Sequence, residues 1–148
     1  MLHSSPTLVI SIEGNLTLAD AYLSGQAADF DDPNRFYASF QSKIREMAKL
    51  DEALLRFSCS VQFADSRTLW TLGRSVLEFS APGADYLSLT CPCVYYWDPV
   101  SSTADSKAFL ARENVRHRKT LGVGHWPMIA APALFYAAVE QDVLKASD

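Results

Sequence analysis

The sequence has no surplus of positive charge and no long apolar run, and each absence excludes a class of protein. The 148 residues carry a formal net charge of −4, whereas a nucleic-acid-binding face needs a concentrated excess of Lys and Arg. No apolar stretch approaches the roughly 20 residues that a membrane-spanning helix needs. Residues 1–6 do not join a basic segment to an apolar one, so we expect no secretion signal. Neither nucleic acid nor a membrane is therefore expected as a partner.

Cysteine is also scarce, with Cys59, Cys91 and Cys93 as the full set. An odd number of cysteines without a secretion signal favours reduced thiols and a cytoplasmic location. One residue separates Cys91 from Cys93, which does not fit a CxxC redox pair, and no second Cys/His cluster is present to complete a zinc site. The sequence thus predicts no metal and no cofactor, with the three thiols as small buried apolar groups.

What the sequence does contain is an alternation of short apolar segments with helical patterns. Residues 8–12 and 93–97 are continuous apolar runs, typical of strands buried on both faces of a parallel sheet, and 117–121 is a more polar strand candidate. Helices are predicted over 33–50, 66–79, 103–112 and 132–145. The first begins at the N-cap pair Asp32-Pro33, and Pro82-Gly83 is expected to close the second. This order predicts an α/β fold with about three parallel strands and flanking helices.

The segment from Cys91 to Leu144 resembles the C-terminal part of the α/β-hydrolase fold. The matching features are the Pro-led strand 92–97 with Asp98 at its end, the segment 119–121, the loop Gly124-His125-Trp126-Pro127, and the helix from Pro132. Residues 8–15 are similar to the preceding strand of that sheet. The resemblance implies three parts: a strand with an acid-bearing turn at 1–16, a helical cap at 17–90, and the last two strands, histidine loop and C-terminal helix at 91–148.

The resemblance assigns His125 the role of catalytic histidine, the general base that takes a proton from a nucleophile or a water. Two acids could orient it, Glu13 at the end of the first strand and Asp98 at the end of the second. Asp98 has no Gly-x-x-Asp turn at the family's usual offset, which favours Glu13. A turn or helix-capping role is the alternative for both carboxylates.

Aromatic residues are the candidates for a binding site for a small apolar substrate. Trp97 and Trp126 flank the expected acid and histidine, and Phe40 and Trp70 belong to the helical middle of the chain. At helical spacing such residues are more often core than pocket lining, so both interpretations stand.

One departure from the family pattern concerns the nucleophile. The sequence contains neither G-x-S-x-G nor G-x-D-x-G, the strained elbow that exposes the family's attacking atom. We expect the nucleophile and the oxyanion hole to belong to a part of the enzyme upstream of Met1, so the chain alone would not hydrolyse an ester, epoxide or haloalkane. The alternatives are a split hydrolase completed by a partner chain, and a non-catalytic ligand-binding domain. The first strand would then present an uncovered edge, with self-association as a possible result.

Overall fold

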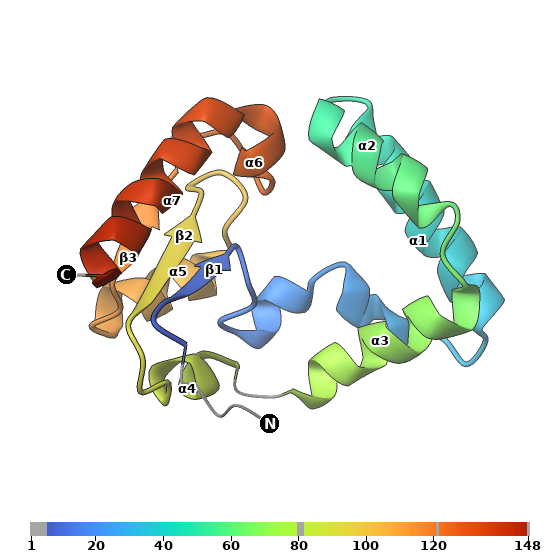
Figure 1. The fold of residues 1–148 in the computed structure, drawn as a ribbon. Coiled ribbons are helices and arrows are strands. Elements are labelled where there is room, and N and C mark those ends of the chain that lie inside the picture. Colours follow the sequence, from blue (N-terminus) through green and yellow to red (C-terminus); the bar gives the residue numbers. More distant parts are fainter. Residues whose placement is uncertain (1–5, 80–81, 121, 148) are drawn as a thin grey trace, which may run out of the picture. The chain divides into compact units, whose positions relative to one another are not determined.

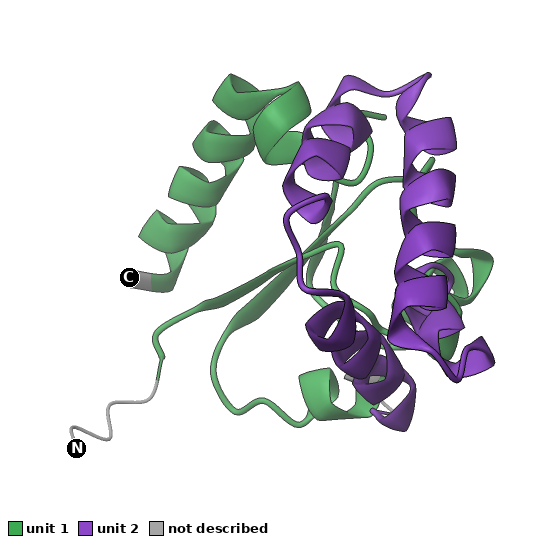
Figure 2. Ribbon diagram, turned by 90° about the vertical axis from the view of Figure 1, so that its right-hand side faces the viewer, with its two compact units in different colours: residues 1–20, 81–148 green, residues 21–80 purple. Residues whose placement is uncertain are grey.

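The computed structural model describes residues 6–79, 82–120 and 122–147. They form two compact units, coloured green and purple in Figure 2. The first, here called the sheet unit, comprises residues 1–20 and 81–148, and the second, the helical unit, comprises residues 21–80. The helical unit is narrower than the expected cap at 17–90, because 17–20 and 82–90 pack with the sheet.

A sheet of three parallel strands forms the centre of the sheet unit (Figure 1). The strands are β1 (Val9–Ile12), β2 (Cys93–Trp97) and β3 (His117–Lys119), in the spatial order β1-β2-β3. Val9 pairs with Cys93 and Tyr95 with His117. The predicted α/β class with three parallel strands is confirmed. Because parallel strands end at the same edge, the residues that follow β1, β2 and β3 come together.

Helices cover both faces of this sheet. They are α4 (Pro82–Leu87), α5 (Ala104–Arg112), α6 (Pro127–Ala130) and α7 (Pro132–Ser147). Because side chains alternate along a strand, Tyr95 packs with Phe109 of α5 on one face. Val94 and Tyr96 pack with Phe135 of α7 on the other.

A buried carboxylate attaches α7 to the sheet. Asp142 is fully buried on the inner side of α7, where it accepts hydrogen bonds from the hydroxyl of Tyr96 at 2.7 Å and from Nη2 of Arg118 at 2.9 Å. Arg116 and Nε of Arg118 complete its shell. Burial alone would raise the pKa of Asp142, but the hydrogen bonds from Arg118 and Tyr96 and the two positive charges hold this pKa below its ordinary value.

A second carboxylate joins the turn after β1 to the start of α5. Asp20 accepts from the backbone N–H groups of Leu16 and Thr17, both at 2.8 Å. It also accepts from Thr103 at 2.6 Å and Ser106 at 2.5 Å. Burial opposes ionisation of Asp20, yet these hydrogen bonds leave its pKa lowered. The turn after β1 is therefore fixed against the loop that follows β2.

The helical unit contains η2 (Ser24–Asp29), α1 (Pro33–Ala48), α2 (Glu52–Val61) and α3 (Ser66–Glu78). Each of the three α-helices begins at an aspartate whose side chain accepts from the first turn: Asp32, Asp51 and Asp65. The predicted N-cap at Asp32 is confirmed. The stripe Phe36, Phe40 and Ile44 forms the core of this unit, each side chain at most 5% exposed.

Several local expectations were wrong. Pro82-Gly83 begins α4 rather than ending the preceding helix, which stops at Glu78. Cys59 is exposed rather than buried. The four-residue α6 was not predicted, and β3 ends at Lys119, with position 121 outside the described residues. Across the described part of the chain, no helix is both long and apolar enough to cross a bilayer.

Candidate active site

The turn after β1 places Glu13 at the carboxyl edge of the sheet. Its backbone N–H continues the ladder to β2 by donating to the carbonyl of Tyr96 at 2.9 Å. Glu13 then adopts a φ of 48°, in the left-handed region that residues other than glycine seldom occupy. The hydroxyl of Tyr95 holds the next residue by donating to the carbonyl of Gly14 at 2.6 Å. Such local strain is most often found where a side chain must point in one required direction.

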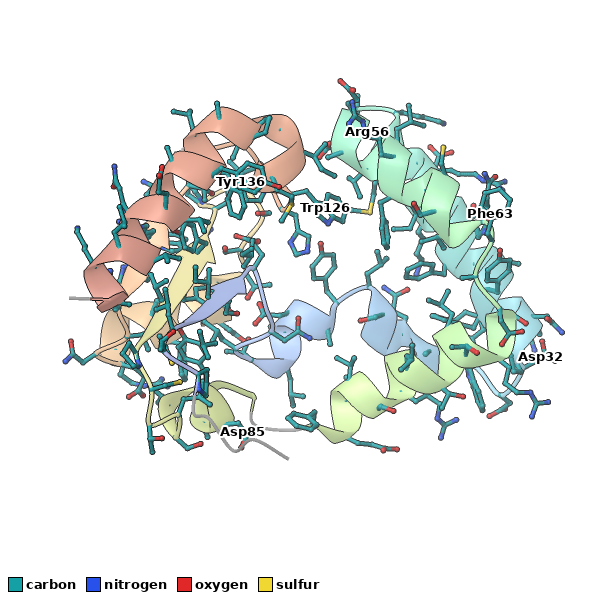
Figure 3. All side chains as sticks on the ribbon, viewed as in Figure 1. Asp32, Arg56, Phe63, Asp85, Trp126 and Tyr136 are labelled. Atoms are coloured by element: carbon teal, nitrogen blue, oxygen red, sulfur yellow. The ribbon has the colours of Figure 1, made fainter. Side chains whose placement is uncertain are left out.

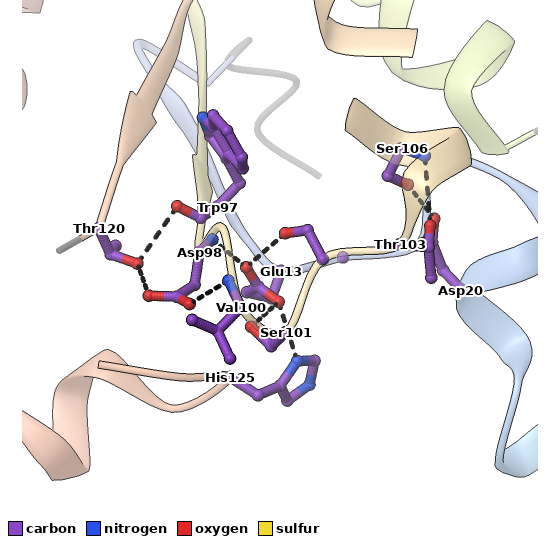
Figure 4. A network of polar contacts seen from close by, with 12 residues as sticks. Glu13, Asp20, Trp97, Asp98, Val100, Ser101, Thr103, Ser106, Thr120 and His125 are labelled. Carbon is purple, nitrogen blue, oxygen red and sulfur yellow. Dashed lines mark hydrogen bonds and ion pairs between the residues drawn. The ribbon is translucent and has the colours of Figure 1, made fainter. Parts of the chain in front are cut away.

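The carboxylate of Glu13 is almost completely enclosed, with 4% of its side chain exposed, and four donors surround it (Figure 4). Ser102 donates to Oε1 and Ser101 to Oε2, both at 2.9 Å. The backbone N–H of Asp98 also donates to Oε1. The fourth partner is Nδ1 of His125, 3.1 Å from Oε2. These four contacts hold the carboxylate in one position.

The loop that carries His125 depends on glycine. Gly122 and Gly124 have φ values of 67° and 80°, which an L side chain would disfavour. After His125, the ring of Trp126 packs edge-to-face on the imidazole, with centroids 4.9 Å apart, and Pro127 begins α6. The imidazole is thus held between a turn on one side and an indole on the other.

Asp98 does not contact the imidazole; it holds the backbone of this loop instead. Its fully buried carboxylate accepts from the N–H of Val123 at 2.8 Å, from Thr120 at 3.0 Å and from the N–H of Val100 at 2.8 Å. Burial would raise the pKa of Asp98, but the hydrogen bonds from Val100, Thr120 and nearby backbone groups leave this pKa below its ordinary value. Of the two acids that the sequence offers, Glu13 is therefore the one beside His125. Asp98 instead holds Thr120 and Val123, in the loop that leads to His125.

The protonation of the imidazole follows from its partner. A carboxylate only accepts hydrogen bonds, so Nδ1 of His125 carries a proton. In the neutral ring Nε2 then has a free lone pair. The side chain of His125 is 43% exposed.

Known proteins provide no relative of this chain. No family model, curated protein or solved structure matches this chain.

The four aromatic candidates occupy three settings. Trp126 lies against His125. Trp97 packs with the core beneath α5, and its Nε1 is buried without a hydrogen-bond partner among the described residues. Phe40 is 5% exposed within the core of the helical unit. Trp70 packs against the same core and donates from Nε1 to the carbonyl of Phe30 at 2.9 Å.

Ser101 and Ser102 are the members of the site that the sequence did not single out. The available signal was their place, in the turn Asp98-Pro99-Val100 that leaves the carboxyl end of the central strand and leads into them. Among the described residues, no group of three or more His, Cys, Asp and Glu side chains is arranged to hold a metal ion. The oriented imidazole beside a fixed carboxylate is an arrangement suited to acid–base chemistry.

Proposed function

We propose that the sheet unit supplies the acid and the histidine of an α/β-hydrolase-type active site, acting on a small apolar ester, epoxide or haloalkane. The observation that supports this most is the contact between Nδ1 of His125 and the enclosed carboxylate of Glu13. The three parallel strands place these two residues at one edge of the sheet although 112 positions separate them in sequence.

In this proposal Glu13 orients the ring and His125 moves the proton. The carboxylate holds the Nδ1–H tautomer and stabilises the imidazolium that forms when Nε2 takes a proton. The proton comes from a nucleophilic hydroxyl or, for a covalent carboxylate ester intermediate, from the attacking water. Ser101 and Ser102 support the pair indirectly, because their hydrogen bonds keep the carboxylate in place.

The nucleophile is the part of this chemistry that the chain does not provide. No G-x-S-x-G or G-x-D-x-G elbow occurs in the 148 residues, and that elbow also contributes one donor of the oxyanion hole. We propose that a further polypeptide segment, or a separate partner chain, brings both to His125. The 148-residue chain by itself is then without turnover.

An esterase assay tests the inactivity of the chain. We expect wild type and His125→Ala to release p-nitrophenol from the butyrate ester at the same slow rate, without saturation. A fluorophosphonate probe, which labels activated serines, should leave both unlabelled. Saturable turnover that the His125→Ala substitution abolishes would show that this chain holds its own nucleophile and would overturn that part of the proposal.

Identifying the source of the nucleophile tests the other half. Affinity purification of the tagged chain from its native cells, followed by native mass measurement, should yield a species that contains a G-x-S-x-G or G-x-D-x-G elbow, in the same polypeptide or in a partner. That species should react with a hydrolase probe, and its His125→Ala form should not. A stable, probe-silent monomer of the 148 residues alone would contradict the proposal.

A further inference from the structure

A groove of about 440 Å³ lies within the sheet unit, between β3 and α7, and the proposed hydrolase site does not use it. In Figure 1 these two elements lie next to one another. Phe135, Leu134 and Ala138 of α7 and Pro127 of α6 form its apolar wall. Neither Glu13 nor His125 lines it. A volume of this size suits a small organic molecule.

The opposite wall is formed by β3 together with Tyr96 of β2. β3 is the last strand in the order β1-β2-β3, and no described strand pairs with its outer side. The carbonyl of Arg116 accepts from the N–H of Tyr95 in β2, and the N–H of Thr120 donates to the carbonyl of Trp97 in β2. Since alternate residues of a strand direct their backbone groups to opposite sides, the N–H groups of His117 and Lys119 point away from β2. The groove therefore combines an apolar wall with backbone donors that no described strand pairs.

The charge of the groove is positive, although the protein as a whole is negative. Arg118 and Lys119 line it, and none of its lining residues is an aspartate or glutamate. Nearby Asp142 is one carboxylate shared between two guanidinium groups, those of Arg116 and Arg118, which leaves one positive charge uncompensated. No acidic side chain among the described residues pairs with Lys119. The formal net charge of the chain is −4, so the positive charge is a local property of this groove.

We propose that this groove binds a small monocarboxylate with an apolar tail, such as a medium-chain fatty acid. The tail lies against Leu134, Phe135 and Ala138, and the carboxylate lies near the Arg118 guanidinium, whose side chain is on the α7 side of the sheet, and near the outward N–H groups of β3. A neutral molecule of the same length gains the apolar contacts without the charge interaction and binds more weakly. This inference does not depend on the hydrolase proposal, because the two sites share no residue named for catalysis.

The test compares octanoate with 1-octanol, below micelle formation, by ¹H–¹⁵N NMR titration of the full chain. For octanoate we expect a dissociation constant on the order of 1 mM, with shifts concentrated at Val123, Ala131 and Ala138. For octanol we expect at least threefold weaker binding at the same residues. Arg118→Gln should weaken octanoate binding about three- to fivefold and leave octanol unchanged, because one partly exposed charge pair changes an affinity by at most about fivefold.

Matched variants separate this site from general apolar association. Lys145→Gln removes one charge from α7 outside the groove and should leave both affinities unchanged, whereas Ala138→Phe should fill the groove and abolish both. If Ala138→Phe or Arg118→Gln does not fold, the comparison of octanoate with 1-octanol on the wild type still decides. Equal binding of the acid and the alcohol, shifts spread over Tyr136 and Leu144 on the outer face of α7, or no saturation by about 10 mM would each overturn the proposal.

Discussion

Removing the carboxylate of Asp142 should destabilise the sheet unit more than any single change on its surface. Asp142 is fully buried and receives the hydroxyl of Tyr96, which is 1% exposed, together with the guanidinium groups of Arg116 and Arg118. In Asp142→Ala the hydroxyl of Tyr96 stays buried without an acceptor. The two arginine side chains, 44% and 30% exposed, can turn toward water instead.

These exposures set the expected magnitude. An unsatisfied buried hydroxyl costs about 1–3 kcal/mol. A fully buried ion pair broken on one side costs about 3–5 kcal/mol, and a surface pair at most about 1 kcal/mol. Because the two arginines are partly exposed, losing their ion pairs with Asp142 should cost about 1–2 kcal/mol. Relief of the desolvation of one carboxylate offsets some of this. We expect Asp142→Ala to lower the free energy of unfolding by about 3 kcal/mol.

Urea unfolding followed by circular dichroism measures this difference, and Tyr96→Phe is the matched control. The phenylalanine keeps the ring against Phe135 and removes only the hydroxyl, so it should cost about 1 kcal/mol. A loss below about 1 kcal/mol for Asp142→Ala would refute the account of how α7 is attached. So would a Tyr96→Phe variant that is as unstable as Asp142→Ala.

The remaining predictions concern pH and glycine packing. The pKa values of Asp98 and Asp142 lie below their ordinary value in the folded chain. The two carboxylates therefore stabilise the fold fully above about pH 4, and this stabilisation is lost as pH falls through the folded pKa. Measuring the free energy of unfolding against pH in acid should show this loss, and the loss should be smaller in Asp98→Asn. Burial raises the pKa of Tyr86 to about 12, so its phenol should ionise late in an ultraviolet titration and destabilise the fold between about pH 10 and 12. Gly73→Ala should cost about 1–3 kcal/mol in thermal unfolding, because the added Cβ would lie 2.5 Å from a backbone oxygen, despite an intrinsic helix gain near 1 kcal/mol. Gly122→Ala meets no atom within 4 Å and should cost only the roughly 1–2 kcal/mol of its positive φ.

The sequence predicted the sheet because its signals are local. The apolar runs at 8–12 and 93–97 each carry their own pattern, and β1 and β2 formed within one residue of those limits. The helix start at Asp32 was equally readable, since an N-cap depends on three or four neighbouring residues. The helix predicted over 103–112 begins at Ala104, with Thr103 as its N-cap. The four-residue α6 had too few positions for any periodicity to show.

The environment of the candidate site could be read only in part. Glu13 was preferred to Asp98 because the turn after β2 lacks an acid at the expected offset, and Glu13 is the acid that contacts the imidazole; its catalytic role stays a prediction. The contacts of Ser101 and Ser102 with Glu13 span 88 and 89 positions and depend on how two turns meet. No periodicity within either turn encodes such a contact.

The tautomer of His125 tests the central claim most directly. Long-range ¹H–¹⁵N spectra, recorded where the imidazole is neutral, should show His125 protonated at Nδ1 and bare at Nε2. Glu13→Ala should shift His125 toward the Nε2–H form that free imidazole side chains prefer in water. His117, whose Nδ1 lies 2.9 Å from the carbonyl of Val115, should keep its own spectrum and report an intact fold. An Nε2-protonated His125 in the wild type, or an unchanged tautomer in Glu13→Ala with His117 undisturbed, would contradict the account.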